Sequence, residues 1–222
     1  MIKIISINTR SFKKRKLELE RLTKENSPDI VLLQETMHGE DEKLNLHNYS
    51  VYEEPRKKGA GGVAILIKKN MKAFPLYFST LKKETKIEII GATMKFKDFK
   101  VTFISTYAPP KANLSDFELF DSLDLENSII GGDFNAHHNQ WDANKTDTKG
   151  MYLWETIKDR MVLTDTTKSP TCRKIGCLAT TPDLVLVGNG VNAVVKSFKV
   201  LESIGSDHSP ICVNLLFDRA MS

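Results

Sequence analysis

The sequence lacks any long run of apolar residues. Its longest unbroken apolar stretch covers residues 63–67, whereas a helix that crosses a bilayer needs about 20 such residues. The first eight residues alternate between apolar and polar side chains, so neither the apolar region nor the cleavage site of a secretory signal is visible. We therefore expect no membrane partner and no export from the cell.

Cysteine is also scarce. Cys172, Cys177 and Cys212 form an odd set, and no two of them have the CxxC spacing of a zinc site. A chain of 222 residues can bury a core without disulfides, so this set indicates a reducing, intracellular compartment. None of the three stands beside a histidine in the sequence, and we expect no cysteine nucleophile.

The excess of positive charge is small, because 32 lysines and arginines face 28 aspartates and glutamates and leave a net charge of +4. Short basic runs at residues 13–16, 56–58, 68–69 and 82–83 can face a phosphate backbone, although a solvated surface explains each run on its own. With 41% apolar and 27% charged residues the composition is that of a globular protein. We expect a single domain over residues 1–222.

Most apolar residues alternate or cluster in short segments that are typical of strands. We expect strands over residues 2–7, 30–33, 49–52, 63–67, 87–94, 101–107, 129–130, 184–187, 194–200 and 211–217. We expect helices over residues 17–26, 115–123 and 151–161, and a tight hairpin connection at 95–98. Strands outnumber helices, so the pattern predicts a mixed α/β fold.

Polar residues follow several of the expected strands. Glu35 comes after the second strand and offers a hard oxygen ligand of the kind that Mg²⁺ prefers. Two glycines precede Asp133 and allow a sharp turn, so Asp133 can orient or deprotonate water while Asn135 and Asn8 donate to anionic oxygens. His208 stands beside a carboxylate just before a strand, which makes it the candidate acid, base or charge stabiliser.

Together these segments resemble the exonuclease-endonuclease-phosphatase superfamily, and most closely the endonuclease domain of non-LTR (LINE-type) retrotransposons, which is related to AP endonucleases. The resemblance covers essentially the whole chain. The residues that carry it stand in the family's order: Asn8, Gln34-Glu35, Thr106-Tyr107-Ala108-Pro109-Pro110, Gly132-Asp133-Phe134-Asn135-Ala136-His137-His138, Pro170-Thr171, Pro182-Asp183-Leu184 and Ser206-Asp207-His208. It implies a DNase I-like α/β fold, a four-layer sandwich of two packed mixed β-sheets flanked by helices.

The resemblance also implies which residues would handle the metal and the water. Glu35 would be the principal metal ligand, with Asn8 beside it. Asp207 would sit at or near a metal or second-metal position. Asp133 would align and activate the attacking water.

Other matching residues would act on the phosphate. Asn135 and Tyr107 would hold the scissile phosphate, and Thr171 would help to shape its pocket. Asp183 would orient the imidazole of His208, which would stabilise charge on the phosphate.

Three basic residues are candidates for DNA contacts. AP endonucleases carry an aspartate where Arg10 stands, so Arg10 puts a second metal site in doubt and makes AP-site repair less expected. Arg10 can instead contact a DNA phosphate, or it can be an ordinary surface residue. Arg173 and Lys174 lie in an expected hairpin loop that in related endonucleases helps to select the target, by reading bases or by binding phosphate.

Two features near Asn135 have less specific readings. His137 can bind DNA or serve a structural role, and nothing places other metal ligands beside it at the usual spacing. We expect Trp141 to pack in the core rather than stack on a base.

These observations predict an enzyme, a DNA endonuclease that depends on Mg²⁺, with Mn²⁺ able to replace it. It would nick one strand of double-stranded DNA to leave a 3′-hydroxyl and a 5′-phosphate, and the resemblance implies that the 3′ end primes reverse transcription in the nucleus. We expect the chain to be part of a larger polyprotein with a reverse transcriptase, and the isolated domain to be monomeric. The alternatives are an AP-site repair endonuclease or phosphatase of the same superfamily, and a non-catalytic DNA-binding module.

Overall fold

The computed structural model describes residues 1–39, 41–54, 61–78, 85–96, 99–165 and 167–217. The basic runs at 56–58 and 82–83, and residues 97–98 of the expected hairpin connection, lie outside these ranges. The elements are β1 (Ile2–Asn8), α1 (Phe12–Asn26), β2 (Ile30–Gln34), β3 (Tyr49–Glu54), β4 (Val63–Lys68), β5 (Phe74–Leu76), β6 (Glu88–Lys95), β7 (Lys100–Tyr107), the 3₁₀ helix η2 (Leu114–Ser122), β8 (Ser128–Asp133), α2 (Thr148–Ile157), β9 (Met161–Leu163), β10 (Asp183–Gly188), β11 (Ala193–Val200) and β12 (Ile211–Phe217).

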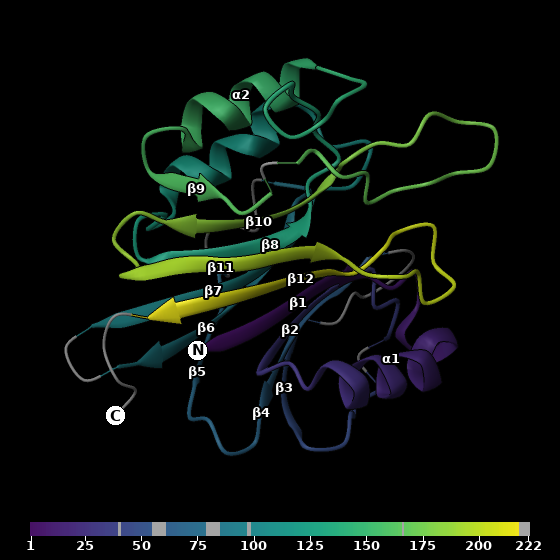
Figure 1. Cartoon of the computed structure of the whole chain (residues 1–222), viewed down its shortest axis with the longest axis vertical. Coiled ribbons are helices and arrows are strands. Elements are labelled where there is room, and N and C mark those ends of the chain that lie inside the picture. Colours follow the sequence, from purple (N-terminus) through teal and green to yellow (C-terminus); the bar gives the residue numbers. More distant parts are fainter. Residues whose placement is uncertain (40, 55–60, 79–84, 97–98, 166, 218–222) are drawn as a thin grey trace.

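The strands form two sheets that lie face to face (Figure 1). One sheet has the order β11-β12-β1-β2-β4-β3, and the other has the order β5-β6-β7-β8-β10-β9. Each sheet contains one parallel pair, β1 with β2 and β7 with β8, while its other neighbours are antiparallel. Both sheets are therefore mixed, as the family resemblance implied.

Side chains alternate between the two faces of each strand, and the buried apolar ones gather in three clusters. Ile4, Leu32, Phe103 and Ile129 belong to the cluster between the two sheets, and each is fully buried. Their sequence neighbours point to the opposite faces, because successive side chains of a strand alternate. One outer face packs under η2 and α2, and the other packs under α1 (Figure 1). The result is helix, sheet, sheet, helix, which confirms the expected four-layer sandwich.

The first helix is fixed at both ends by local chemistry. The Ser11 side chain accepts a hydrogen bond from the Lys14 backbone at the N-cap, and Ser27 ends the helix in the left-handed conformation. Phe12, Leu19 and Leu22 are buried under the sheet. The helix begins at Phe12, five residues earlier than the sequence predicted, because Ser11 caps it at that point.

All ten expected strands are present, but four other features differ from expectation. The short strands β5 and β9 were not predicted. The segment at 114–122 is a 3₁₀ helix rather than the expected α-helix over 115–123, and its capping box is formed by Asn113 and Asp116. The helix predicted to reach Met161 ends at Ile157, and Met161 begins β9.

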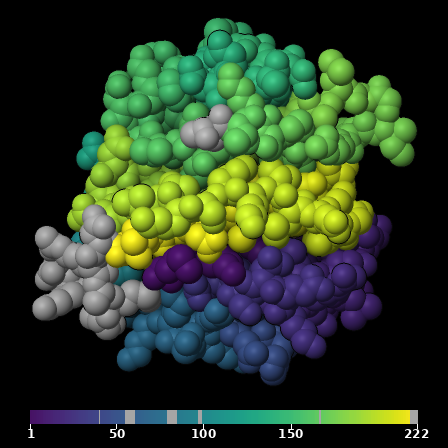
Figure 2. Space-filling model, viewed as in Figure 1, coloured from purple at the N-terminus to yellow at the C-terminus, as the bar shows by residue number. Residues whose placement is uncertain are grey.

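One segment projects from the body of the molecule. Figure 2 shows the green chain between β9 and β10 extending beyond the body of the molecule, beside the yellow loop that leads into β12. Within the described residues, every helix is too short or too polar to cross a membrane.

Candidate active site

The candidate site lies where strands of both sheets end. Asn8 is the last residue of β1, and Glu35 follows the parallel strand β2. Tyr107 and Asp133 end the parallel pair β7 and β8 as register partners, and Asp183 begins the antiparallel strand β10 opposite Asp133. Strand registry therefore brings five polar side chains from distant parts of the sequence to one edge.

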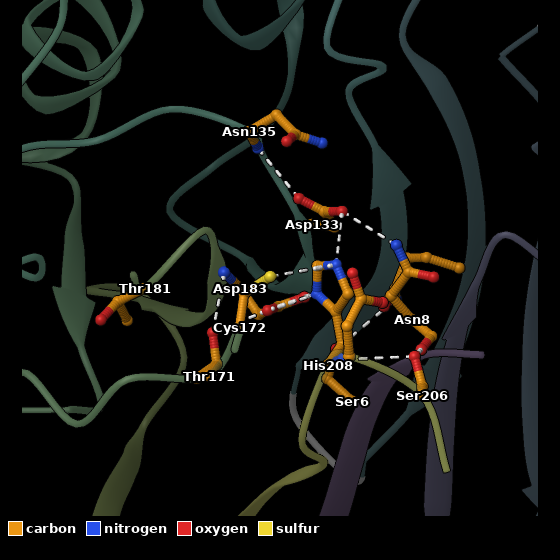
Figure 3. A network of polar contacts seen from close by, with 12 residues as sticks. Ser6, Asn8, Asp133, Asn135, Thr171, Cys172, Thr181, Asp183, Ser206 and His208 are labelled. Carbon is orange, nitrogen blue, oxygen red and sulfur yellow. Dashed lines mark hydrogen bonds and ion pairs between the residues drawn. The ribbon is translucent and has the colours of Figure 1, made fainter. Parts of the chain in front are cut away.

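His208 and Asp183 form a buried pair at the centre of this edge (Figure 3). The imidazole Nδ1 donates to the Asp183 carboxylate at 2.8 Å, and the Thr171 hydroxyl donates to the same carboxylate at 2.6 Å. Burial alone would lower the pKa of an imidazole, but the charge of Asp183 and its hydrogen bond outweigh burial and raise the pKa of His208 to about 12. His208 is thus an imidazolium at neutral pH.

Asp133 faces the other side of the same imidazole. Its Oδ2 lies 3.8 Å from His208 Nε2 and accepts a hydrogen bond from Asn8 Nδ2 at 2.9 Å, while its Oδ1 accepts from the Asn135 backbone at 3.0 Å. Burial and the nearby charge of Asp183 raise the pKa of Asp133 to about 7, against these opposing contacts. The carboxylate is therefore able to take up a proton near neutral pH.

Asn8 joins Glu35 to this cluster. Its Nδ2 donates to Glu35 Oε1 at 2.7 Å as well as to Asp133, so one amide nitrogen holds both carboxylates. Both carboxylates are buried. Asp133 has the imidazole of His208 beside it, whereas in the described part of the chain no lysine, arginine or histidine pairs with Glu35. Buried carboxylates need a compensating charge, and oxygen donors without a basic partner suit a divalent cation such as Mg²⁺.

Asn135 and Tyr107 lie around Asp133. Asn135 adopts a left-handed conformation with φ of 42°, and its Nδ2 donates to the Ala108 carbonyl at 2.9 Å. Tyr107 is buried, and its pKa is raised by burial and by the charges of Glu35 and Asp133, so the hydroxyl keeps its proton. The two residues keep neutral polar groups next to the carboxylates.

Arg10 and Asp207 pair with each other beside the cluster. Arg10 Nε lies 2.8 Å from Asp207 Oδ1, and the two side chains are 42% and 22% exposed. The Arg10 partner is therefore a carboxylate of this protein, which neither of the readings of Arg10 included. The pair also engages one oxygen of the carboxylate that the resemblance would give to a metal.

Arg173 and Lys174 are exposed on the projecting segment between β9 and β10. Backbone hydrogen bonds link Thr171 and Cys172 to Thr180, so the base of this segment is an antiparallel hairpin as predicted. A cavity of about 250 Å³ lies below it, lined by Pro110, Asn135, His137, Lys145, Cys172, Lys174, Cys177, Leu178, Thr180, Pro182 and His208. Lys174 thus lines a cavity that reaches the candidate site, whereas Arg173 is not among the described residues that line it.

The sequence did not indicate the contact between Cys172 and His208. Cys172 Sγ lies 3.7 Å from His208 Nε2, although the two residues are 36 positions apart. No cysteine stands beside a histidine in the sequence, but in the folded chain Cys172 and His208 are in contact. Only the packing of the hairpin against the loop before β12 reveals this pair.

A second buried histidine lines the same cavity. His137 Nδ1 lies 2.7 Å from Asp142 Oδ2, which also accepts a hydrogen bond from the Thr181 backbone at 3.0 Å. The spacing of His137 and Asp142 is a signal that could have suggested their pairing. Trp141 is fully buried and donates to the Ala136 carbonyl, which confirms the expected packing role.

Comparison with known proteins identifies the family. A family model described as "Endonuclease-reverse transcriptase" matches residues 101–212, half of the chain. "Probable RNA-directed DNA polymerase from transposon X-element" of Drosophila melanogaster is 27% identical over 205 residues, which cover 89% of this chain and 22% of that protein. "RNA-directed DNA polymerase from mobile element jockey" of Drosophila melanogaster is 26% identical over 217 residues, which cover 95% of this chain and 23% of that protein. The chain thus spans less than a quarter of the length of these relatives.

Solved structures share the fold over nearly the whole chain. The endonuclease domain of TRAS1, a telomere-specific non-LTR retrotransposon, has a TM-score of 0.77 at 17% identity, with 97% of this chain and 98% of that chain covered. The AP endonuclease LMAP from Leishmania major has a TM-score of 0.75 at 17% identity, with 96% and 86% covered. The chain belongs to the endonuclease-reverse transcriptase family and has the DNase I-like fold of the endonuclease domains of non-LTR retrotransposons.

Proposed function

We propose that this chain is a Mg²⁺-dependent endonuclease that nicks one strand of double-stranded DNA. One observation carries the proposal: a buried imidazolium, His208, lies between Asp183 and Asp133, while no basic side chain among the described residues pairs with Glu35. Cleavage of a phosphodiester needs a positive charge near the phosphate oxygens, an acceptor for the proton of water and a place for a metal. These residues supply all three within one cluster.

His208 acts on the phosphate as a fixed positive charge. Because the charge and the hydrogen bond of Asp183 raise its pKa, His208 favours the protonated form and serves as a positive charge rather than as a base. Asp183 keeps Nδ1 occupied, so Nε2 is the atom that faces the non-bridging oxygens. Asn135 and Tyr107 supply neutral donors to the same phosphate, and Thr171 holds Asp183 in place.

Asp133 acts on the water. With a pKa near 7 it accepts the water proton as the water oxygen bonds to phosphorus and the bond from phosphorus to the 3′ oxygen breaks. The 3′ oxygen takes up a proton from solvent, to which Asp133 later releases its own, and the products are a 3′-hydroxyl and a 5′-phosphate. Asn8 and the Asn135 backbone fix the carboxylate through both of its oxygens.

Glu35 and Asn8 would hold the metal, with Asp207 nearby but paired to Arg10. A bound Mg²⁺ supplies charge neutralisation for the phosphate and for the departing oxygen. Glu35 has φ of 46°, and its carbonyl accepts from the Ser11 backbone at 2.8 Å, so the turn after β2 fixes the direction of its side chain.

The test is relaxation of supercoiled plasmid to open circles. We expect wild-type protein to nick the plasmid with Mg²⁺ or Mn²⁺ and to stop nicking when EDTA is added. We expect the nicking rates of Glu35→Gln and His208→Gln each to be at least a hundredfold lower than that of wild type. His47→Gln, which changes an exposed histidine, is the matched control. Nicking that persists in the double variant Glu35→Gln/His208→Gln would overturn the proposal.

The same assay separates the alternatives. Faster cleavage of an abasic duplex than of intact plasmid would indicate a repair endonuclease, and release of inorganic phosphate from a 3′-phosphorylated strand would indicate a phosphatase. Salt-sensitive DNA binding without turnover would indicate a non-catalytic module. End-labelling of the products, with a 3′-hydroxyl that a polymerase extends, supports the proposed chemistry.

We also propose that the nick primes reverse transcription within a longer protein that acts in the nucleus. The curated relatives support this proposal, because they are several times longer than the chain and are named RNA-directed DNA polymerases. Arg173 and Lys174 would influence where the DNA is cut, from their exposed hairpin beside the cavity, and Arg10 would add a DNA contact if it left Asp207. Mapping of cut sites for Arg173→Ala/Lys174→Ala against wild type tests the first role, and unchanged sites would contradict it.

A further inference from the structure

Cys172 is brought to His208 by a short antiparallel bridge. The two residues are bridge partners, and the flanking backbone hydrogen bonds run from Arg173 N to the Asp207 carbonyl at 2.9 Å and from Ser209 N to the Thr171 carbonyl at 2.7 Å. The bonds flank the pair rather than join it, and in such a pair the side chains approach most closely. The thiol is therefore held against the imidazole by backbone geometry.

The distance between these two groups matches that of neighbouring ligands on one ion. Tetrahedral zinc with bonds of about 2.3 Å to sulfur and about 2.0 Å to nitrogen separates the two ligand atoms by roughly 3.5 Å. Cys172 Sγ and His208 Nε2 are 3.7 Å apart, so both can reach one ion with little movement. The bridge thus preforms half of a tetrahedral site.

Two carboxylates, Asp207 and Asp183, lie next to this pair. One oxygen of Asp207 forms a set with ligand atoms of Cys172 and His208 in which all distances are within 4.8 Å. The Arg10 Nε lies 2.8 Å from Oδ1 of that carboxylate, and a carboxylate has a second oxygen. Asp183 hydrogen-bonds Nδ1 of His208, which is the arrangement that orients a histidine to bind zinc through Nε2.

A small ion can reach the pair, because Cys172 and His208 both line the cavity of about 250 Å³ under the hairpin. This donor set differs from the all-oxygen donors at Glu35 and Asn8. Thiolate and imidazole prefer Zn²⁺ or Co²⁺, whereas carboxylate and amide oxygens suit Mg²⁺. The two sets therefore select different metals.

We propose that Cys172, His208 and Asp207 form a binding site for a thiophilic divalent cation such as Zn²⁺, and that its occupation inhibits DNA cleavage. Binding exchanges the proton at His208 Nε2 for the ion, so the same nitrogen cannot face a phosphate. The inhibitory role rests on the proposed nuclease function, but the binding site does not.

The binding site is tested by absorption spectroscopy on the full chain after removal of bound metal. Addition of Co²⁺ to wild-type protein should produce the near-ultraviolet charge-transfer band of a thiolate–Co²⁺ bond at one equivalent, and Zn²⁺ should remove it. Cys172→Ser and His208→Gln should each abolish the band. Cys177→Ser, which removes an exposed thiol from the same hairpin, should retain it.

Two spectroscopic results would overturn the site: no band in wild-type protein, or a band that depends on Cys177 and survives in Cys172→Ser. This readout needs no catalysis, so it separates failure of the metal site from failure of the nuclease proposal.

Inhibition is then measured as the nicking rate at fixed Mg²⁺ with and without Zn²⁺, each variant compared with its own zinc-free rate. We expect wild type and Cys177→Ser to slow at least tenfold at saturating Zn²⁺, and Cys172→Ser to slow less than twofold. If Zn²⁺ displaces Co²⁺ from the wild-type protein but leaves its nicking rate unchanged, the inhibitory role is overturned.

Discussion

Asp133 combines complete burial with a charge that its function requires. Its raised pKa means that the folded protein binds a proton where the unfolded chain, with an ordinary aspartate near 3.8, has lost it. This contribution to stability is fully present below about pH 4 and is lost as the pH rises toward 7. The residue that we propose as the base thus destabilises the folded protein under the conditions in which it works.

We expect the unfolding free energy of wild-type protein in EDTA to fall between pH 4.5 and 6.5 more steeply than that of Asp133→Asn, which cannot ionise. Urea unfolding at several pH values measures both slopes. The exposed Asp159→Asn is the control and should follow wild type. Parallel curves for wild type and Asp133→Asn would contradict the raised pKa.

At the scale of the elements, the end of β8 depends on the absence of a side chain at Gly132. A Cβ there would lie 1.9 Å from the Thr106 carbonyl oxygen and 2.7 Å from the Thr106 Cγ2. Thr106 and Gly132 are partners in the parallel ladder, so β7 cannot move away without loss of the register that sets Tyr107 opposite Asp133. Gly132 is therefore needed both for the pairing of β7 with β8 and for the position of Asp133 opposite Tyr107.

We expect Gly132→Ala to destabilise the protein by about 3 kcal/mol, at the upper end of the usual cost of overpacking, and to reduce nicking even where the protein is folded. Urea denaturation and plasmid nicking measure the two effects. Gly39→Ala, whose added Cβ would meet no atom within 4 Å, should change neither. Equal behaviour of the two variants would show that the clash is relieved at no cost.

At the scale of the whole molecule, the site depends on two sheets that contribute different residues. Asn8 comes from one sheet and Asp133 from the other, and their hydrogen bond spans the gap between the sheets. Below them, Gln34 donates to Ser105 at 3.0 Å across the same interface, and the apolar core lies deeper. We propose on this basis that residues 1–222 unfold as one domain.

We expect Phe103→Ala, in the core between the sheets, to cost about 3–5 kcal/mol with a single unfolding transition. Tryptophan fluorescence, which reports on the layer beside β8, and far-ultraviolet circular dichroism should give the same midpoint. Leu216→Ala, at a 38% exposed position of β12, should cost under about 1 kcal/mol. Two separate midpoints would contradict the single domain.

The sequence predicted the elements whose apolar residues form a clear pattern, and it missed or misassigned the short elements that lack one. Ile129 and Ile130 sufficed to locate β8, but β5 is a three-residue edge strand with every residue exposed, so it lacks an alternating pattern. Met161 continued the helical spacing of α2, but it pairs as a strand with Gly188. In both cases pairing with a neighbouring strand, rather than local propensity, decides the structure.

The sequence by itself determined the mixed α/β class, the alternation that fills three cores, and the polar residues Glu35, Asp133 and His208 at strand ends. These are local properties, because consecutive residues alone determine whether side chains alternate with a period of two and whether a strand is followed by a polar residue. Only the tertiary structure decided that Arg10 pairs with Asp207 and that Cys172 faces His208. Such contacts join residues 36 to 197 positions apart, and they depend on registry and packing that no segment of the chain specifies alone.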